Sequence, residues 1–139
     1  MRRLWAPNGP TEFDANKLSA AIDAVTKQGY TQITEAALDN GYWEIDAMQG
    51  NTAVELQVDP QTGRVLRVEP ESRRPLPPKD GPTADRIVRD LEAAGFMSFT
   101  EVDYEGTHWE VEASRGGVRR EVIVDVLSGK VISDRTDPE

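Results

Sequence analysis

The chain has 139 residues, a length that suits one compact domain or two small halves, and its 25 acidic and 16 basic residues give a formal net charge of -9. A surface this acidic repels the phosphates of nucleic acids and of anionic membranes, and no apolar run reaches the ~20 residues that span a bilayer. The chain contains no cysteine, which excludes disulfides, thiolate catalysis and zinc–thiolate sites.

The first predicted element is an amphipathic helix. Its apolar side chains recur at helical spacing, at Leu18, Ala21, Ile22 and Val25. We expect Asp14 or Asn16 to cap its N-terminus, and Gly29 to end it because glycine readily adopts the left-handed conformation found after a helix. Upstream of the helix, Trp5 and Phe13 either hold the N-terminus against the sheet edge or belong to a pre-sequence.

Four short strands are expected to follow this helix. Their predicted ranges are 31–38, 42–48, 52–58 and 64–69. In the second range Trp43 and Ile45 alternate with Glu44, and this period of two predicts an antiparallel strand with one buried face. Between the third and fourth strands, Asp59 can accept hydrogen bonds from the turn backbone, and Gly63 can supply the positive φ that closes a hairpin.

The same pattern occurs a second time. When the sequence is shifted by 66 residues, residues 18–69 align with residues 84–135 without a gap, and twelve positions are identical, Trp43 and Trp109 among them. The second copy therefore predicts another helix, capped by Thr83 and ended by Gly95. Its strands are predicted at 100–104, 108–114, 118–124 and 130–134.

Between the copies, residues 70–82 contain five prolines and predict an extended linker. We therefore divide the chain into a first repeat, 14–69, the linker, 70–82, and a second repeat, 83–136. The predicted fold class is α+β, with two repeats that each pack one helix on a four-stranded antiparallel sheet. The opposite face of each sheet has no helix to cover it, so it must meet water, the other copy or a partner.

Residues 29–66, GYTQITEAALDNGYWEIDAMQGNTAVELQVDPQTGRVL, resemble the PepSY family. The shared features are a helix ending in Gly-aromatic, a GYWEIDA-type strand, a G…VEL.VD strand and a closing D..TG.V turn. Residues 95–132 fit the same pattern more loosely, with Val126 in place of Pro60 and Ser128 in place of Thr62. The tandem layout is also similar to the beta-lactamase-inhibitor-protein fold, an analogy at the level of the fold alone.

The resemblance implies a periplasmic or secreted bacterial protein without catalytic activity. It implies a peptidase or another exported protein as the partner. We expect the protein to be a monomer or a weak dimer. The first ten residues, MRRLWAPNGP, lack the apolar segment of a signal peptide, so we expect the export signal to lie outside this sequence. We predict no catalytic residue, no cofactor and no metal ligand.

Acidic residues are concentrated on the strand positions predicted to face away from the helices. These positions are Glu44, Asp46 and Glu55 in the first copy and Glu110, Glu112 and Glu121 in the second. One interpretation is a solvated strand face that prevents aggregation. The other is a calcium-binding or small-ligand sensor, although no EF-hand spacing is present.

The residues expected to contact a protein partner lie on the same predicted face. These interface candidates are Tyr42, Glu44, Met48, His108, Glu110 and Ile123. His108 is the only histidine, and in a chain without cysteine we expect it to be a surface strand residue. Trp43 and Trp109 are either interface residues or core residues, and their phase with Ile45 and Val111 favours the core.

Overall fold

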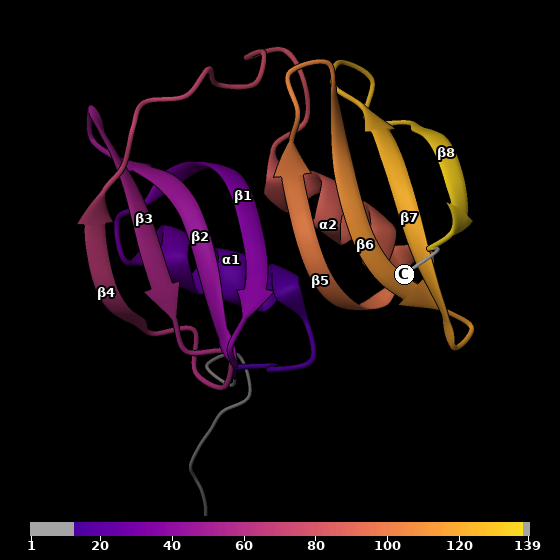
Figure 1. Cartoon of the computed structure of the whole chain (residues 1–139), viewed down its shortest axis with the longest axis horizontal. Helices are drawn as coiled ribbons and strands as arrows, with labels where there is room; N and C mark the ends of the chain where they lie inside the picture. Colours follow the sequence, from indigo (N-terminus) through magenta and orange to yellow (C-terminus); the bar gives the residue numbers. More distant parts are fainter. Residues whose placement is uncertain (1–12, 138–139) are drawn as a thin grey trace, which may run out of the picture.

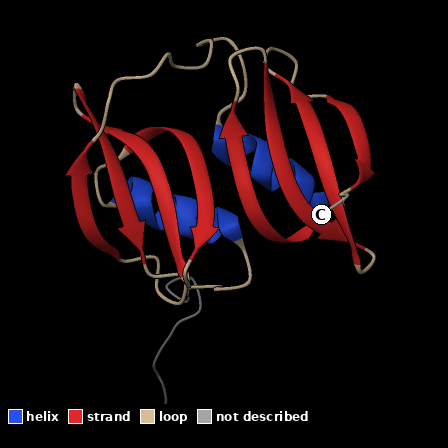
Figure 2. Ribbon diagram, in the orientation of Figure 1, coloured by secondary structure: helices blue, strands red, loops and turns tan. Residues whose placement is uncertain are grey.

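The structure is a computed structural model that describes residues 13–137. Two helices lie side by side on one face of an antiparallel sheet (Figure 1 and Figure 2). The first half of the described chain forms α1 (Leu18–Lys27), β1 (Thr31–Asp39), β2 (Tyr42–Gln49), β3 (Thr52–Val58) and β4 (Val65–Pro70). The second half forms α2 (Ala84–Ala93), β5 (Met97–Tyr104), β6 (His108–Arg115), β7 (Val118–Asp125) and β8 (Val131–Thr136). The predicted α+β class is confirmed.

All eight strands belong to one sheet, in the order β4-β3-β2-β1-β5-β6-β7-β8. The prediction of two separate four-stranded sheets is therefore corrected: β1 pairs with β5 across the middle, which joins the two halves. A strand with a free edge exposes unpaired backbone groups, and this pairing satisfies the inner edges of both halves.

The central pairing has a symmetric register. Glu35 lies opposite Asp103, Ala36 opposite Val102, and Ala37 opposite Glu101. In the 66-residue repeat Glu101 is the counterpart of Glu35, and Asp103 is the counterpart of Ala37. Each pairing is therefore matched by its reciprocal, as in a two-fold symmetric interface, with the approximate axis at the Ala36–Val102 pair.

The repeat extends to irregularities that the sequence pattern did not reveal. Gln32 and Ser98, which are 66 positions apart, have φ angles of 52° and 53°, unusual for residues other than glycine. The pairing register shifts at these places in both halves. The bulge interrupts the alternation of side chains, and the strand predicted at 100–104 begins at Met97, the counterpart of Thr31 at the start of β1.

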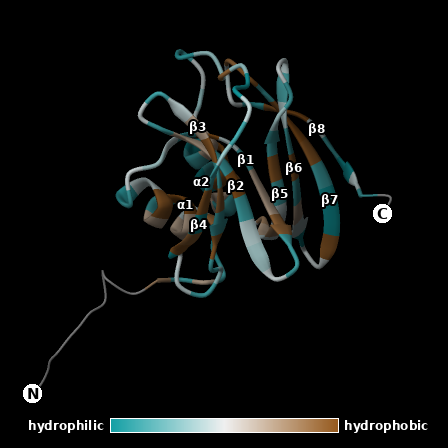
Figure 3. Cartoon of the chain, turned by 60° about the vertical axis from the view of Figure 1, so that its left-hand side comes forward, coloured by the Kyte–Doolittle hydropathy of each residue, from teal (hydrophilic) through white to brown (hydrophobic). Residues whose placement is uncertain are grey.

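The core lies between the helices and the sheet, and both tryptophans belong to it. Trp43 is 7% exposed and Trp109 is 0% exposed, which confirms that they are core residues. In β3, Val54, Leu56 and Val58 are buried, as the alternation predicts. Hydrophobic and hydrophilic bands alternate along the strands in Figure 3.

The two helices begin differently. Thr83 Oγ1 accepts a hydrogen bond from the backbone N–H of Arg86 at 3.1 Å, which confirms the predicted cap of α2. The N-cap of α1 is Lys17, which makes no capping hydrogen bond through its side chain. The expectation that Asp14 or Asn16 caps α1 is wrong, because Asp14 Oδ1 accepts instead from the backbone N–H of Asn16.

The turn after β3 forms as predicted and also packs against the helix. Asp59 Oδ1 accepts from the backbone N–H of Gln61 at 2.8 Å, and Gly63 has a φ of +75°. A Cβ at Gly63 would lie 2.6 Å from Ala24 Cβ and 2.7 Å from Phe13 Cε1. Phe13 packs against the core here, so it anchors the chain before α1, whereas Trp5 lies outside the described residues.

The proline-rich linker is packed at both ends. Its beginning continues the edge strand: Pro70 ends β4, and the backbone N–H of Glu71 donates to Ala53 O at 2.9 Å. Its end is in close contact with the turn after β7, where a Cβ added to Gly81 would clash with the carbonyl oxygen of Val126. The linker therefore connects the halves along a defined path.

Candidate functional site

The sheet face opposite the helices, here called the outer face, carries a line of acidic side chains. Strand pairing places six of them next to one another on six neighbouring strands. This carboxylate row consists of Glu69, Glu55, Asp46, Glu35, Asp103 and Glu110. Neighbouring strands are about 4.8 Å apart, so the four inner carboxylates have a like charge close by on both sides, and Glu69 and Glu110 have one on one side. The row crosses the boundary between the two halves of the molecule.

A second line of acidic residues lies two positions along the strands. Glu101 of β5 is opposite Glu112 of β6, which is opposite Glu121 of β7. Across the central boundary, Glu101 is opposite Ala37, whose other neighbour is Glu44 of β2. The outer face is therefore acidic over most of its strands.

One arginine from the linker lies across the carboxylate row. Arg74 Nη2 is 3.0 Å from Asp46 Oδ2, and Arg74 Nη1 is 3.5 Å from Glu35 Oε1. The Asp46 side chain is only 9% exposed, whereas that of Arg74 is 47% exposed. The linker thus supplies a positive charge to the first half of the row.

Burial, together with the crowding of carboxylates, changes their proton affinities. Burial raises the pKa of Asp46 to about 7, against the opposing effect of Arg74. Burial, a hydrogen bond with Glu105 and the charge of Glu35 raise the pKa of Asp103 to about 8. The pKa values of Glu55 and Glu101 are also raised, mainly by burial and then by neighbouring carboxylates. A bound cation would relieve this repulsion.

Two groups of carboxylates come close enough to share a cation. The ligand oxygens of Glu35, Glu101 and Asp103 lie within 4.8 Å of one another, and so do those of Asp46, Glu55 and Glu71. Oxygen ligands of this kind suit calcium. The first group joins both halves of the molecule, because Glu35 is on β1 and the other two are on β5.

Five of the six interface candidates have side chains that are at least partly exposed on the outer face, in two groups. Tyr42, which is 40% exposed, and Glu44 lie on β2; His108, Glu110 and Ile123 lie on β6 and β7. His108 Nε2 is 3.2 Å from Glu110 Oε2, and Ile123 is directly opposite Glu110. Strands β1 and β5 separate the two groups.

The expectation that Met48 is exposed is wrong. It lies on the outer face but is only 4% exposed, and it lines a small hollow together with Arg74 and Leu76 of the linker. Alternation along β2 placed Met48 on the correct face, but it gave no information about the linker that packs there.

Sequence reasoning missed three residues at the centre of the outer face: Glu35, Asp103 and Arg74. The identity of Glu35 and Glu101 in the two copies was a signal that could have drawn attention to β1 and β5. No local pattern indicated that these strands pair, and none indicated that Arg74 folds back onto them.

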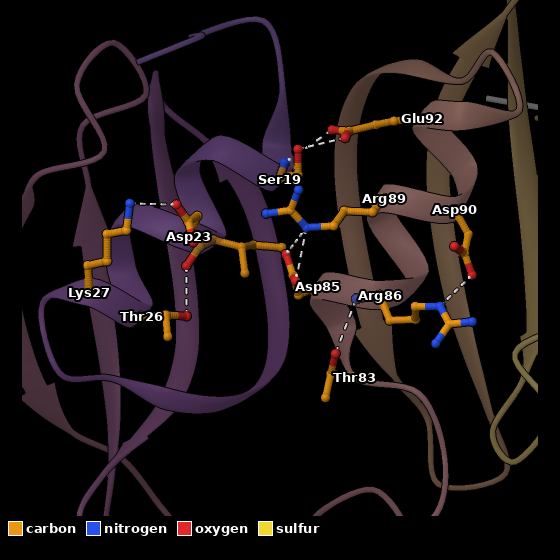
Figure 4. A network of polar contacts seen from close by, with 11 residues as sticks. Ser19, Asp23, Thr26, Lys27, Thr83, Asp85, Arg86, Arg89, Asp90 and Glu92 are labelled. Atoms are coloured by element: carbon orange, nitrogen blue, oxygen red, sulfur yellow. Dashed lines mark hydrogen bonds and ion pairs between the residues drawn. The ribbon is translucent and has the colours of Figure 1, made fainter. Parts of the chain in front are cut away.

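The helix layer differs from the outer face because its charges are compensated (Figure 4). Ser19 donates to Glu92 from both its backbone N–H, at 3.1 Å, and its Oγ, at 2.6 Å, which joins α1 to α2. Arg89 Nε is 3.0 Å from Asp85, and Lys27 Nζ is 3.1 Å from Asp23. A hollow of about 460 Å³ lies between α1, the linker and the start of α2, and both of its carboxylates, Asp23 and Asp85, are already in ion pairs.

The first half of the chain matches a known protein family. Residues 8–69 match the PepSY_2 family, described as the peptidase propeptide and YPEB domain. The resemblance predicted from residues 29–66 is thereby confirmed, and the first unit is PepSY-like. For the second repeat the resemblance stays a prediction.

The chain is also similar to a crystal structure of a candidate lipoprotein from Clostridium difficile 630, with 14% identity and a TM-score of 0.47. The similarity covers 91% of this chain and 95% of that one. None of the curated proteins matches the chain. Within residues 13–137, neither helix has the length and apolar character needed to cross a membrane.

Proposed function

We propose that this protein, whose residues 8–69 match the PepSY_2 family, is an extracytoplasmic binding module that restrains a peptidase. The observation that carries the proposal is the outer face, a broad antiparallel surface over which neither helix of residues 13–137 lies. The family's description as a peptidase propeptide domain supports a peptidase as the partner.

The arrangement of the acidic groups supports binding rather than catalysis. General acid–base catalysis needs groups that converge on one reacting bond, usually in a pocket. Here the carboxylates are spread along rows that follow the strand pairing. Such an arrangement offers charge and shape to an extended surface of another protein.

The interface proposed for the partner includes equivalent positions in the two halves. Tyr42 and His108 are counterparts in the repeat, and so are Glu44 and Glu110. Ile123 adds an apolar side chain beside Glu110. A partner that contacts both groups would cross β1 and β5, and with them the carboxylate row.

The test is capture followed by an activity assay. The full chain, immobilised, is exposed to an extracytoplasmic extract, and each captured peptidase is purified and assayed with increasing amounts of the free chain. We expect saturable loss of peptidase activity at micromolar concentration. Captured peptidases that remain fully active, or capture of no peptidase, would overturn the proposal.

The alternative function that we consider is cation sensing, which the grouping of Glu35, Glu101 and Asp103 favours. Calcium titration followed by NMR separates it from protein binding. Localised, saturable shifts at these residues and at Glu44, Asp46, Glu110 and Glu112 would support a sensor. Weak shifts spread over all acidic residues would remove this alternative.

A further inference from the structure

The negative charges of the outer face are neutralised by arginines to different extents in its two halves. In the first half Arg74 contacts Asp46 and Glu35, and at the far edge Arg135 Nη2 is 2.5 Å from Glu121. Between them lies a four-carboxylate array, which consists of Glu101 and Asp103 on β5 and Glu110 and Glu112 on β6. Within the described chain, no lysine or arginine nitrogen comes within 4.0 Å of a carboxylate of this array.

Arg119 on β7 uses its guanidinium for hydrogen bonds to neutral groups. Arg119 donates from Nη1 to Ser98 O at 2.6 Å and to Ser114 Oγ at 3.0 Å. Its Nη2 donates to Thr100 Oγ1 at 2.5 Å. The guanidinium therefore binds neutral groups and makes no ion pair with the acidic side chains of β5 and β6, among which Glu110 has His108 Nε2 at 3.2 Å as its basic neighbour.

Arg74 shows how this surface receives a cation. It comes from a segment outside the strands, and its guanidinium reaches two carboxylates on neighbouring strands, Asp46 on β2 and Glu35 on β1. Guanidinium groups suit such a position because their N–H groups can reach two acceptors at once. The array on β5 and β6 has the same cross-strand arrangement of carboxylates, with Glu101 opposite Glu112 and Asp103 opposite Glu110.

We propose that the four-carboxylate array receives a basic extended segment of a partner protein, with arginine or lysine at alternate positions. This inference rests on the proposed function and names the chemistry of the partner's contact segment. Side chains on one side of an extended chain recur every ~6.6 Å, which is also the spacing of Glu101 and Asp103 along β5 and of Glu110 and Glu112 along β6. A segment lying along these strands therefore faces the array with each basic residue in register.

The unrelieved repulsion in the array supports this assignment. Burial and then neighbouring carboxylates raise the pKa of Glu101, and burial followed by the groups facing Asp103 raises the pKa of Asp103 as well. Those groups are Glu35 on β1, Glu101 on the same strand and Glu105 beyond its end. A cation is therefore stabilised more by the carboxylates of this array than by those of the helix layer, which already have ion-pair partners.

The experiment measures binding of an arginine–alanine alternating octapeptide to the full chain by NMR at ~100 mM salt, where exposed charges more than ~10 Å apart are largely screened. The face variant is Glu101→Gln/Glu112→Gln. The control is Asp23→Asn/Asp90→Asn, which removes the same charge from the helix layer. We expect the face variant to weaken binding about tenfold, ~1.4 kcal/mol, and the control less than twofold. Glu110→Gln, on its own, provides a second face variant if the double variant fails to fold.

Three results would overturn the inference. Equal weakening in both double variants would mean general attraction to an acidic protein. Saturable shifts of the array with calcium, without shifts from the peptide, would assign it to a cation. Shifts that grow with protein concentration in the absence of peptide would assign it to a second copy.

The outcome is separable from the proposed function. If the chain inhibits a captured peptidase but does not bind the peptide, this inference is wrong and the proposed function stands. If the chain binds the peptide through the array but inhibits no captured peptidase, the proposed function is wrong and this inference stands.

Discussion

Arg74 Nη2 lies 3.0 Å from Asp46 Oδ2, which fixes a residue of the proline-rich linker onto the middle of the sheet. The same guanidinium reaches Glu35 on the neighbouring strand. The linker therefore acts as more than a connection between the two halves: it neutralises part of the carboxylate row and helps to enclose Met48.

Replacing Arg74 should destabilise the fold moderately. In Arg74→Met, Asp46 stays nearly buried but loses its positive neighbour, so the pKa of Asp46 should rise above about 7. We expect a loss of about 1–2 kcal/mol, between the values for exposed and buried ion pairs, because Arg74 itself is half exposed. Urea denaturation checks the stability, and NMR titration of the Asp46 carboxyl checks the pKa.

The matched control is Arg73→Met, which removes an exposed arginine from the same linker. It should change the free energy of unfolding by less than ~0.5 kcal/mol. An equal loss in the two variants would show that Arg74 contributes only its general positive charge.

Two glycines with similar backbone conformations should respond differently to alanine. Gly50 has a φ of +60° and nothing lies within 4 Å of the position that a Cβ would take there, whereas a Cβ at Gly63 would meet Ala24 and Phe13. Gly50→Ala should cost about 1–2 kcal/mol for the left-handed backbone alone. Gly63→Ala should cost about 2 kcal/mol more because α1 must move. Equal melting temperatures for the two variants would contradict the packing of this turn on the helix.

Trp109 should be among the most sensitive residues of the second half. It is fully buried, and its ring centroid is 5.4 Å from that of Tyr104. Trp109→Ala should destabilise by about 3–5 kcal/mol through the cavity that it leaves. Trp109→Phe should cost less than half as much, since it also removes an indole N–H that has no hydrogen-bond partner among residues 13–137. Chemical denaturation of both variants checks the order.

Asp103 should make stability depend on pH. Because its pKa is raised from 3.8 to about 8 in the folded state, the folded protein holds a proton that the unfolded chain releases. The contribution of Asp103 to stability is thus complete below pH ~4 and is lost as the pH rises to about 8. Asp103→Asn should lack this decline. Between pH 5 and pH 9 its free energy of unfolding should therefore rise by about 1 kcal/mol relative to that of the unmodified chain, after allowance for solvent screening.

Urea denaturation at both pH values measures this difference. Asp90→Asn, an exposed change on α2, controls for the loss of one negative charge. A parallel pH dependence in the Asp103 variant and the unmodified chain would show that this carboxyl ionises as easily in the folded state as in the unfolded chain.

Local pattern predicted much of the architecture, and its limits have physical causes. The alternation around Trp43 identified the buried face of β2, and the aligned second copy gave the same result for Trp109. The pairing of β1 with β5 could not be predicted, because an inner strand and an edge strand have the same alternation, and the partner of an edge is set by contacts distant in sequence.

The acidic surface could be predicted only in part for the same reason. Glu44 and Glu110 were placed on the correct face from their own strands. Asp103 joined the candidate site only through its pairing with Glu35 across the central boundary. Arg74 was expected in an extended linker, where no local rule shows which side chains fold back onto the sheet.

The most direct test of the outer face as the binding surface compares two charge reversals in inhibition of a captured peptidase. Glu101→Lys/Glu112→Lys reverses charge on the outer face, and Asp23→Lys/Asp90→Lys reverses it on the helix layer. We predict that the first raises the inhibition constant at least about tenfold, a loss of ~1.4 kcal/mol, while the second leaves it within a factor of about two. A larger effect from the helix-layer pair would contradict the account.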